Sequence, residues 1–137
     1  MKLKFAHICD STILSKENKL SVIGIFSEIN AQRFPMVHGH FDLALCLEFE
    51  EEDAGKQETV EICLRDPEAK PLRTVNGKIN VPPQITPGQK VQLVLAFDLV
   101  TFTSPGMHQM DVSIGGQRIE AWPLNLIHRG EQNASKT

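Results

Sequence analysis

The sequence has few of the features that mark secreted or membrane proteins. It contains only three cysteines, Cys9, Cys46 and Cys63, and none lies in a Cys-x-x-Cys spacing. Three cysteines cannot all pair within one chain, which favours reduced thiols. No stretch approaches the roughly 18 apolar residues of a membrane span. The N-terminal apolar run is broken by His7 and Asp10, which does not fit a signal peptide. We therefore expect a cytoplasmic protein without a membrane partner.

A surplus of positive charge is also missing. The formal net charge is −3 and aromatic residues make up 6% of the chain, which argues against a nucleic-acid partner. The basic stretch around Lys70, Arg73 and Lys78 has no interleaved aromatic residue, and Glu68 dilutes it. With 137 residues, 41% of them hydrophobic, the chain is long enough for one domain with its own core. We place that domain at residues 1–128, followed by a polar tail at 129–137.

Signatures of catalysis and cofactor binding are missing too. The sequence has no Gly-x-Ser-x-Gly elbow, no Gly-x-x-x-x-Gly-Lys phosphate loop and no Gly-x-Gly-x-x-Gly motif. A Ser-His-Asp triad is assembled in space, so the sequence alone leaves one open. We expect a protein without a cofactor that is not an enzyme.

Alternating apolar side chains are present along most of the chain. In residues 41–49, every second side chain is a large apolar one, from Phe41 to Phe49. The same period of two recurs in residues 59–65, 91–99 and 108–114, and no segment shows the 3.6-residue period of a helix. Residues 20–29 are apolar on both faces, which predicts a strand covered on both sides. Residues 118–127 lose their alternation at Trp122-Pro123, which predicts a β-bulge there.

Turn residues separate these segments. Gly115-Gly116 predicts a two-residue hairpin, and the prolines between residues 82 and 88 predict a loop. Turns are also expected at 53–56, 66–71 and 104–106. About eight short strands with turns between them predict an all-β fold, a single antiparallel β-sandwich of immunoglobulin-like or related Greek-key type.

Several of these segments, in this order, resemble a domain-of-unknown-function family of small bacterial β-sandwich proteins. The matching stretches cover nearly the whole chain; they are residues 19–26, Phe34-Pro35, residues 64–67, residues 104–106 and the Gly115-Gly116 turn. Members often carry a Tyr just after the Pro-Gly pair, where this chain has His108-Gln109-Met110. The resemblance implies a β-sandwich and no catalytic residue.

Two histidines are candidate metal ligands. His38-Gly39-His40 would place two imidazoles on one face of an extended segment, which could begin a Zn²⁺ or Cu²⁺ site. A third ligand would have to come from elsewhere, and the candidates are His7, Cys9, His108 and His128. A solvated His-x-His segment before a strand is the simpler interpretation, so we expect no metal; a metal-dependent enzyme around His38 and His40 is a weaker alternative.

Partly apolar outward faces suggest an interaction surface. Its candidate residues are Ala44, Cys46, Cys63, Val94, Ala96, Val100 and Trp122. If the strands around 53–56 form a hairpin, Cys46 and Cys63 lie near each other, as two thiols or, in principle, as a disulfide or a shared metal site. Trp122 is either part of the core or an anchor for a partner. The apolar surplus needs cover from the protein's own loops or from another subunit.

We therefore expect a non-enzymatic interaction module that self-associates through a sheet face or edge. The alternative is a small-ligand binder with its site at one end of the sandwich, formed by loops 30–40, 82–89 and 102–107.

Overall fold

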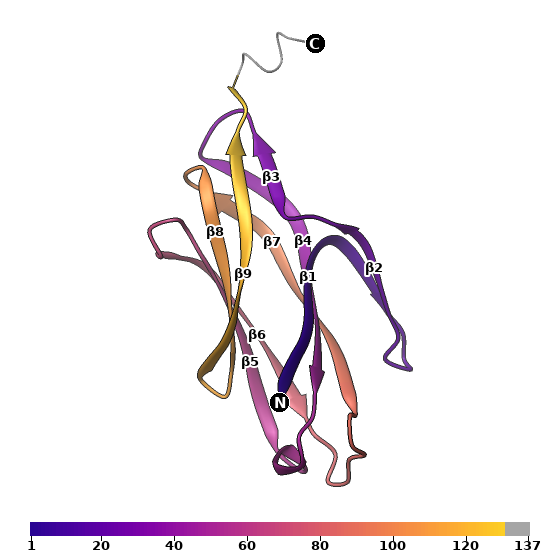
Figure 1. The fold of residues 1–137 in the computed structure, drawn as a ribbon. Coiled ribbons are helices and arrows are strands. Elements are labelled where there is room, and N and C mark those ends of the chain that lie inside the picture. Colours follow the sequence, from indigo (N-terminus) through magenta and orange to yellow (C-terminus); the bar gives the residue numbers. More distant parts are fainter. Residues whose placement is uncertain (131–137) are drawn as a thin grey trace.

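The computed structural model describes residues 1–130, which form nine strands and one short 3₁₀ helix (Figure 1). The strands are β1 (Lys2–Leu14), β2 (Leu20–Ile25), β3 (Glu28–Ala31), β4 (Met36–Glu48), β5 (Gln57–Arg65), β6 (Pro71–Asn80), β7 (Lys90–Phe102), β8 (Gly106–Ile114) and β9 (Gln117–His128), and the 3₁₀ helix η1 is Glu51–Asp53. Most of the predicted tail, residues 131–137, lies outside the described residues. No helix among the described residues is long and apolar enough to cross a membrane.

The strands form two sheets. Sheet A has the order β2-β1-β4-β7 and sheet B the order β3-β9-β8-β5-β6. Neighbouring strands are antiparallel, except that β3 runs parallel to β9. The β1-β4-β7 and β5-β8-β9 orders match the A-B-E and C-F-G orders of the immunoglobulin fold. The predicted all-β sandwich is confirmed, and β2 is an addition to that plan.

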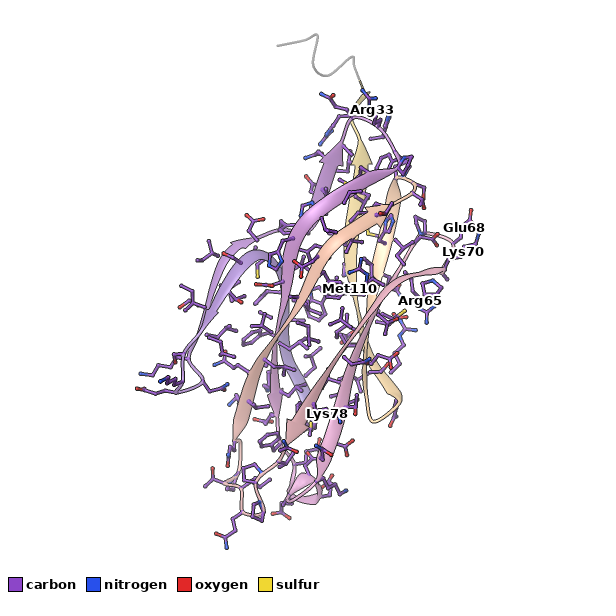
Figure 2. All side chains as sticks on the ribbon, turned by 180° about the vertical axis from the view of Figure 1, so that it is seen from behind. Arg33, Arg65, Glu68, Lys70, Lys78 and Met110 are labelled. Carbon is purple, nitrogen blue, oxygen red and sulfur yellow. The ribbon has the colours of Figure 1, made fainter. Side chains whose placement is uncertain are left out.

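The predicted alternation places the core between the sheets. Fully buried side chains of β4 include Phe41, Leu43 and Leu45, which face buried residues of sheet B such as Ile62. The rings of Phe41 and Phe97 are parallel with centroids 4.9 Å apart. Figure 2 shows the side chains of both sheets filling the space between them, with Met110 labelled inside.

The predicted turns are present. Gly115 and Gly116 join β8 to β9 with φ values of 60° and 83°, the pair of positive values that a type I′ hairpin turn requires. The proline-containing loop separates β6 from β7, and residues 66–70 separate β5 from β6. By contrast, residues 20–29 are split into β2 and β3, which belong to different sheets.

The predicted irregularity in β9 lies earlier in the strand than expected. Val112 pairs with Glu120 and Ser113 pairs with Arg118, so Ile119 is the extra residue. Trp122 then pairs with Met110 and is partly buried against the core. The bulge prediction at Trp122-Pro123 is wrong, because the alternation is already corrected at Ile119, four residues before the proline.

A second irregularity changes the alternation of β7. Leu99 has a φ of 51° and is 68% exposed, whereas Val100 is fully buried in the core. The alternation had placed Leu99 on the core side and Val100 on the outward face. Both assignments are wrong, because the left-handed backbone at Leu99 exchanges the two faces from that residue on.

The cysteines and loops are also arranged differently. β4 and β5 belong to different sheets, so Cys46 and Cys63 do not lie side by side; all three cysteines are unpaired. In the β4–β7 ladder Met36 pairs with Phe102 at one end and Glu48 with Lys90 at the other. Loop 82–89 therefore lies at the opposite end from residues 32–35 and 103–105 (Figure 1). The three loops of the ligand-binding alternative do not gather at one end.

Candidate functional site

The most distinctive surface of the molecule is the β1–β2 hairpin, residues 10–25. β1 pairs with β4 through its first half and with β2 through its second half. The hairpin projects from the side of the sandwich in both views (Figures 1 and 2). Its turn is closed by hydrogen bonds from Asn18 N to Ser15 O and from Ser15 N to Lys19 O, with Asn18 at a φ of 61°. This is a three-residue hairpin loop whose last residue is left-handed.

The hairpin turn is anchored on β7. The Asn18 side chain accepts a hydrogen bond from Gln92 N and donates one to Gln92 O, both at 2.9 Å, and Gln92 Nε2 donates to Asn18 O at 3.0 Å. Farther up the hairpin, Thr12 Oγ1 donates to Asp42 Oδ2 of β4 at 3.0 Å. Nothing in the sequence signalled these long-range contacts.

The two anchoring points explain why part of the outward face of sheet A is buried. Cys46 pairs with Gln92, and Ala44 lies between Cys46 and Asp42 on the same face. Ala44 is 0% and Cys46 4% exposed. The rings of Phe5 and His7, on the neighbouring strand β1, stack at 5.1 Å beside them. The protein itself therefore covers this part of the face, and no second subunit is needed for it.

The opposite face of the hairpin is apolar and exposed. Thr12 points toward sheet A, so its cross-strand neighbour Val22 shares that side, and Ile13 and Ile23 lie on the other. Ile13 is 61%, Ile23 51% and Ile25 59% exposed. We call these three isoleucines the apolar patch. The prediction that this segment is covered on both faces is wrong, because Ile23 and Ile25 are more than half exposed.

The remaining candidate surface residues are scattered. Cys63 is 7% exposed and pairs with Thr74 and Asp111 in sheet B. Val94 is half-buried and Ala96 is exposed on β7.

Burial raises the pKa of the Cys9 and Cys46 thiols, which lowers their reactivity as nucleophiles.

The two candidate metal-binding histidines have separate surroundings. His40 bridges two carboxylates, with Nε2 2.9 Å from Asp42 and Nδ1 2.6 Å from Asp98. The hydrogen bond to Asp98, assisted by the charge of Asp42, raises the pKa of His40. His38 instead packs beside Phe26 and Phe41. Among residues 1–130, no group of three or more His, Cys, Asp or Glu residues is placed to hold a metal ion.

Two of the other candidate ligands, His128 and His108, pack against aromatic rings. His128 packs near Phe34. His108 is fully buried beside Phe102, and its Nδ1 lies 3.0 Å from Gly106 O. Burial lowers the pKa of His108. With Nδ1–H donating to that carbonyl, the imidazole is neutral and its Nε2 has no partner.

The apolar patch borders a hollow at the base of the hairpin. Its volume is about 270 Å³, and its lining includes Ile25, Phe26, His38 and the carboxylates of Asp10 and Glu28. This volume is below the roughly 300–1,000 Å³ of typical small-molecule sites. The hollow adds a polar border to the patch and does not form a catalytic cleft.

Comparison with known proteins supports the fold. Residues 4–127 match the model of a family of unknown function, DUF6941. No match is found among the curated proteins. The structure is similar to part of a β-glucosidase from Listeria innocua. The complex with isofagomine aligns at 10% identity over 92% of this chain and 16% of that one, and the complex with glucose at 12% over 76% and 15%, both with a TM-score of 0.52.

An immunoglobulin-like protein from Pseudomonas aeruginosa aligns over 89% of this chain and 96% of its own, with 12% identity and a TM-score of 0.39. This chain spans only about one sixth of the length of the β-glucosidase. At such low identity, the β-glucosidase likeness shows the fold alone.

Proposed function

We propose that this chain, which belongs to the family of unknown function DUF6941, is a non-enzymatic interaction module that self-associates through the β1–β2 hairpin. The observation that carries the proposal is the apolar patch. Two half-exposed isoleucines, Ile13 and Ile23, are diagonal neighbours on one face of a hairpin whose other face is anchored to the protein, and the exposed Ile25 follows two residues along β2. Contiguous exposed apolar residues of this kind mark interaction sites, whereas single ones are normal.

The location of the exposed apolar side chains supports this choice of surface. Of the large hydrophobic residues exposed within residues 1–130, all but Met107 belong to strands of sheet A. Sheet B instead carries an ionic cluster on its outward face, in which Asp111 binds Arg65 at 2.9 Å and Arg118 at 3.4 Å. Charged residues are depleted from the centres of protein interfaces. The hairpin side of the molecule is therefore the better contact surface.

The size of the patch predicts a weak association. The exposed fractions of its three side chains add up to nearly two whole isoleucine side chains. Burying this exposed area would contribute about 4 kcal/mol per copy. A two-fold contact uses the patch twice, which gives about 8 kcal/mol against an association cost of about 4–15 kcal/mol. The smallest of these costs leaves about 4 kcal/mol, so we expect a dissociation constant of about 1 mM.

The three unpaired cysteines support a reducing compartment, and we place the module in the cytoplasm.

Sedimentation velocity over protein concentrations from about 1 μM to about 1 mM tests the proposal, because the upper end of this range reaches the expected dissociation constant. The wild type should change from monomer to dimer as concentration rises. Ile23→Lys, which places a charge in the patch, should remain monomeric. Met107→Lys is the matched control, since Met107 is 55% exposed but lies on β8 in sheet B, and it should dimerise like the wild type. A monomeric wild type over the whole range would contradict the proposal.

A further inference from the structure

The four sheet edges of the sandwich differ in how they are protected. From this difference we propose that β2 pairs edge to edge, antiparallel, with β2 of a second copy of this chain. The inference rests on the proposed function, because it specifies the geometry of the self-association.

The edge of β7 is occupied by side chains of the same chain. Asn18 binds both the N–H and the C=O of Gln92. Farther along, the Arg73 guanidinium donates to Asp98 O at 2.9 Å and to Leu99 O at 3.3 Å. These contacts use backbone groups that a foreign strand would need for pairing.

The two edges of sheet B are protected in other ways. β6 begins with Pro71 and carries Arg73 and Lys78, of which Lys78 is labelled in Figure 2, and it lies beside β7 of the other sheet. Proline and lysine are residues that natural sheets place on edges to prevent pairing. β3 is only four residues long, Glu28–Ala31, which limits the ladder it can form.

The edge of β2 has none of these devices. The strand Leu20–Ile25 contains no proline and no charged residue. The hydrogen bond from Ser15 N to Lys19 O, which closes the turn, identifies Ser15 and Lys19 as a hydrogen-bonded pair of the β1–β2 ladder. Because such pairs alternate along an antiparallel ladder, the N–H and C=O of Leu20 and Val22 point away from β1, toward the open edge.

A second copy of β2 fits this edge. With Val22 opposite Val22 of the second copy on a two-fold axis, the outward-pointing N–H and C=O groups of the two Val22 residues meet, and the new ladder ends before Gly24, whose φ is 71°. Ile23 then lies diagonal to Ile23 of the second copy, within reach of an aliphatic side chain. The two apolar patches become one continuous surface on a four-stranded sheet.

Charge complementarity favours the antiparallel arrangement. Lys16 and Lys19 lie at the turn before β2, whereas Glu28 and Asp10 lie at its other end and flank the hollow there. An antiparallel pair brings the basic end of each strand to the acidic end of the other. A parallel pair would align like charges, which is unfavourable.

Two substitutions separate edge pairing from face-to-face contact. Val22→Pro removes a donor that points to the open edge and takes no part in the β1–β2 ladder, a position where a strand tolerates proline. Met107→Lys is again the control, because Met107 lies on β8 in sheet B, away from the hairpin. By sedimentation velocity, Val22→Pro should be monomeric at concentrations where the wild type and Met107→Lys are dimers, whereas a face-to-face contact should survive in Val22→Pro and be lost in Ile13→Lys.

Cysteine cross-linking provides a second measurement that does not depend on how well Val22→Pro folds. Edge pairing places the two Val22 Cα atoms about 5.5 Å apart, within the range that a disulfide spans. The two Ile13 positions lie about 14 Å apart, across three strand spacings. Under mild oxidation, Val22→Cys should give a covalent dimer and Ile13→Cys should not.

The outcomes distinguish this inference from the proposed function. A dimer that survives in Val22→Pro but is lost in Ile13→Lys, with cross-linking at position 13 instead of 22, overturns edge pairing and leaves the interaction module standing. A wild type that stays monomeric up to about 1 mM, without cross-linking of Val22→Cys, overturns both. Loss of the dimer in Val22→Pro alone, together with cross-linking at position 22, supports both.

Discussion

Replacing Asn18 with glycine tests whether the turn holds the β1–β2 hairpin on sheet A. Asn18 has a φ of 61°, a conformation that glycine adopts without a Cβ penalty. The turn should therefore keep its shape in Asn18→Gly. The substitution removes the hydrogen bonds that the Asn18 side chain makes to Gln92 N and O, both 2.9 Å long.

The expected cost follows from these two bonds. Each contributes about 1 kcal/mol net, so their loss costs about 2 kcal/mol. The third contact, from Gln92 Nε2 to Asn18 O at 3.0 Å, uses backbone and remains available. Since 1.4 kcal/mol is a factor of ten, opening of the hairpin turn should become about 30-fold more favourable.

Hydrogen exchange of the Gln92 amide reports the loss of this contact, because its N–H donates to the Asn18 side chain and loses that acceptor in Asn18→Gly. Its exchange should accelerate by at least the factor of about 30 that the opening predicts. Glu17→Gln is the control. Glu17 forms a 3.3 Å ion pair with Lys19 in the same turn, but both side chains are highly exposed, so this variant should exchange like the wild type. Unchanged exchange at Gln92 in Asn18→Gly would refute the reasoning.

Three further predictions concern the core and the histidines, and each is read from urea unfolding. Phe97→Ala should lower the free energy of unfolding by about 3–5 kcal/mol, because Phe97 is fully buried and stacks on Phe41; a loss below about 1 kcal/mol would contradict this packing. Burial lowers the pKa of His108, so its unfolded state binds the proton first and stability falls as the pH drops below about 6.5. His108→Leu should reduce this dependence of stability on pH. A variant whose free energy of unfolding changes with pH as steeply as that of the wild type would contradict the prediction. The hydrogen bond to Asp98 raises the pKa of His40, so its stabilisation is complete below about pH 6.5 and is lost as the pH rises through the raised value. His40→Gln should lack this loss, and an unchanged slope above pH 6.5 would show that another group causes it.

Much of the fold was predictable because local patterns determine it. Strict alternation along residues 41–47 identified β4 and its core face, and Gly115-Gly116 identified the β8–β9 hairpin. Alternation says which side chains share a face, but it does not say which strands pair. Placing Cys46 next to Cys63 required β4 and β5 to be neighbours, and the chain instead crosses to the other sheet between them.

The candidate site could be predicted only in part. The sequence pointed to an apolar surplus that includes residues 22–26, and the structure places Ile23 and Ile25 of that segment in the exposed patch. It did not show that β1 leaves β4 after Cys9 and continues with β2. That bend depends on long-range contacts such as Asn18 with Gln92, which no local pattern encodes. The same contacts bury Ala44 and Cys46, which alternation alone had assigned to an open face.

The pairing pattern of sheet A also has a consequence for how the chain folds. The β1–β2 hairpin joins residues close in sequence, as in Ile13 with Ser21, but β4 pairs with β7 about fifty residues further along, as in Leu43 with Leu95. Loop closure over such distances is slow. The hairpin can therefore form early, while the β7 edge that receives Asn18 is completed late. During this interval both faces of the hairpin are exposed to solvent, Ile13 and Ile23 on one face and Val22 on the other. Refolding yield should fall with rising protein concentration, and Ile23→Lys should restore it.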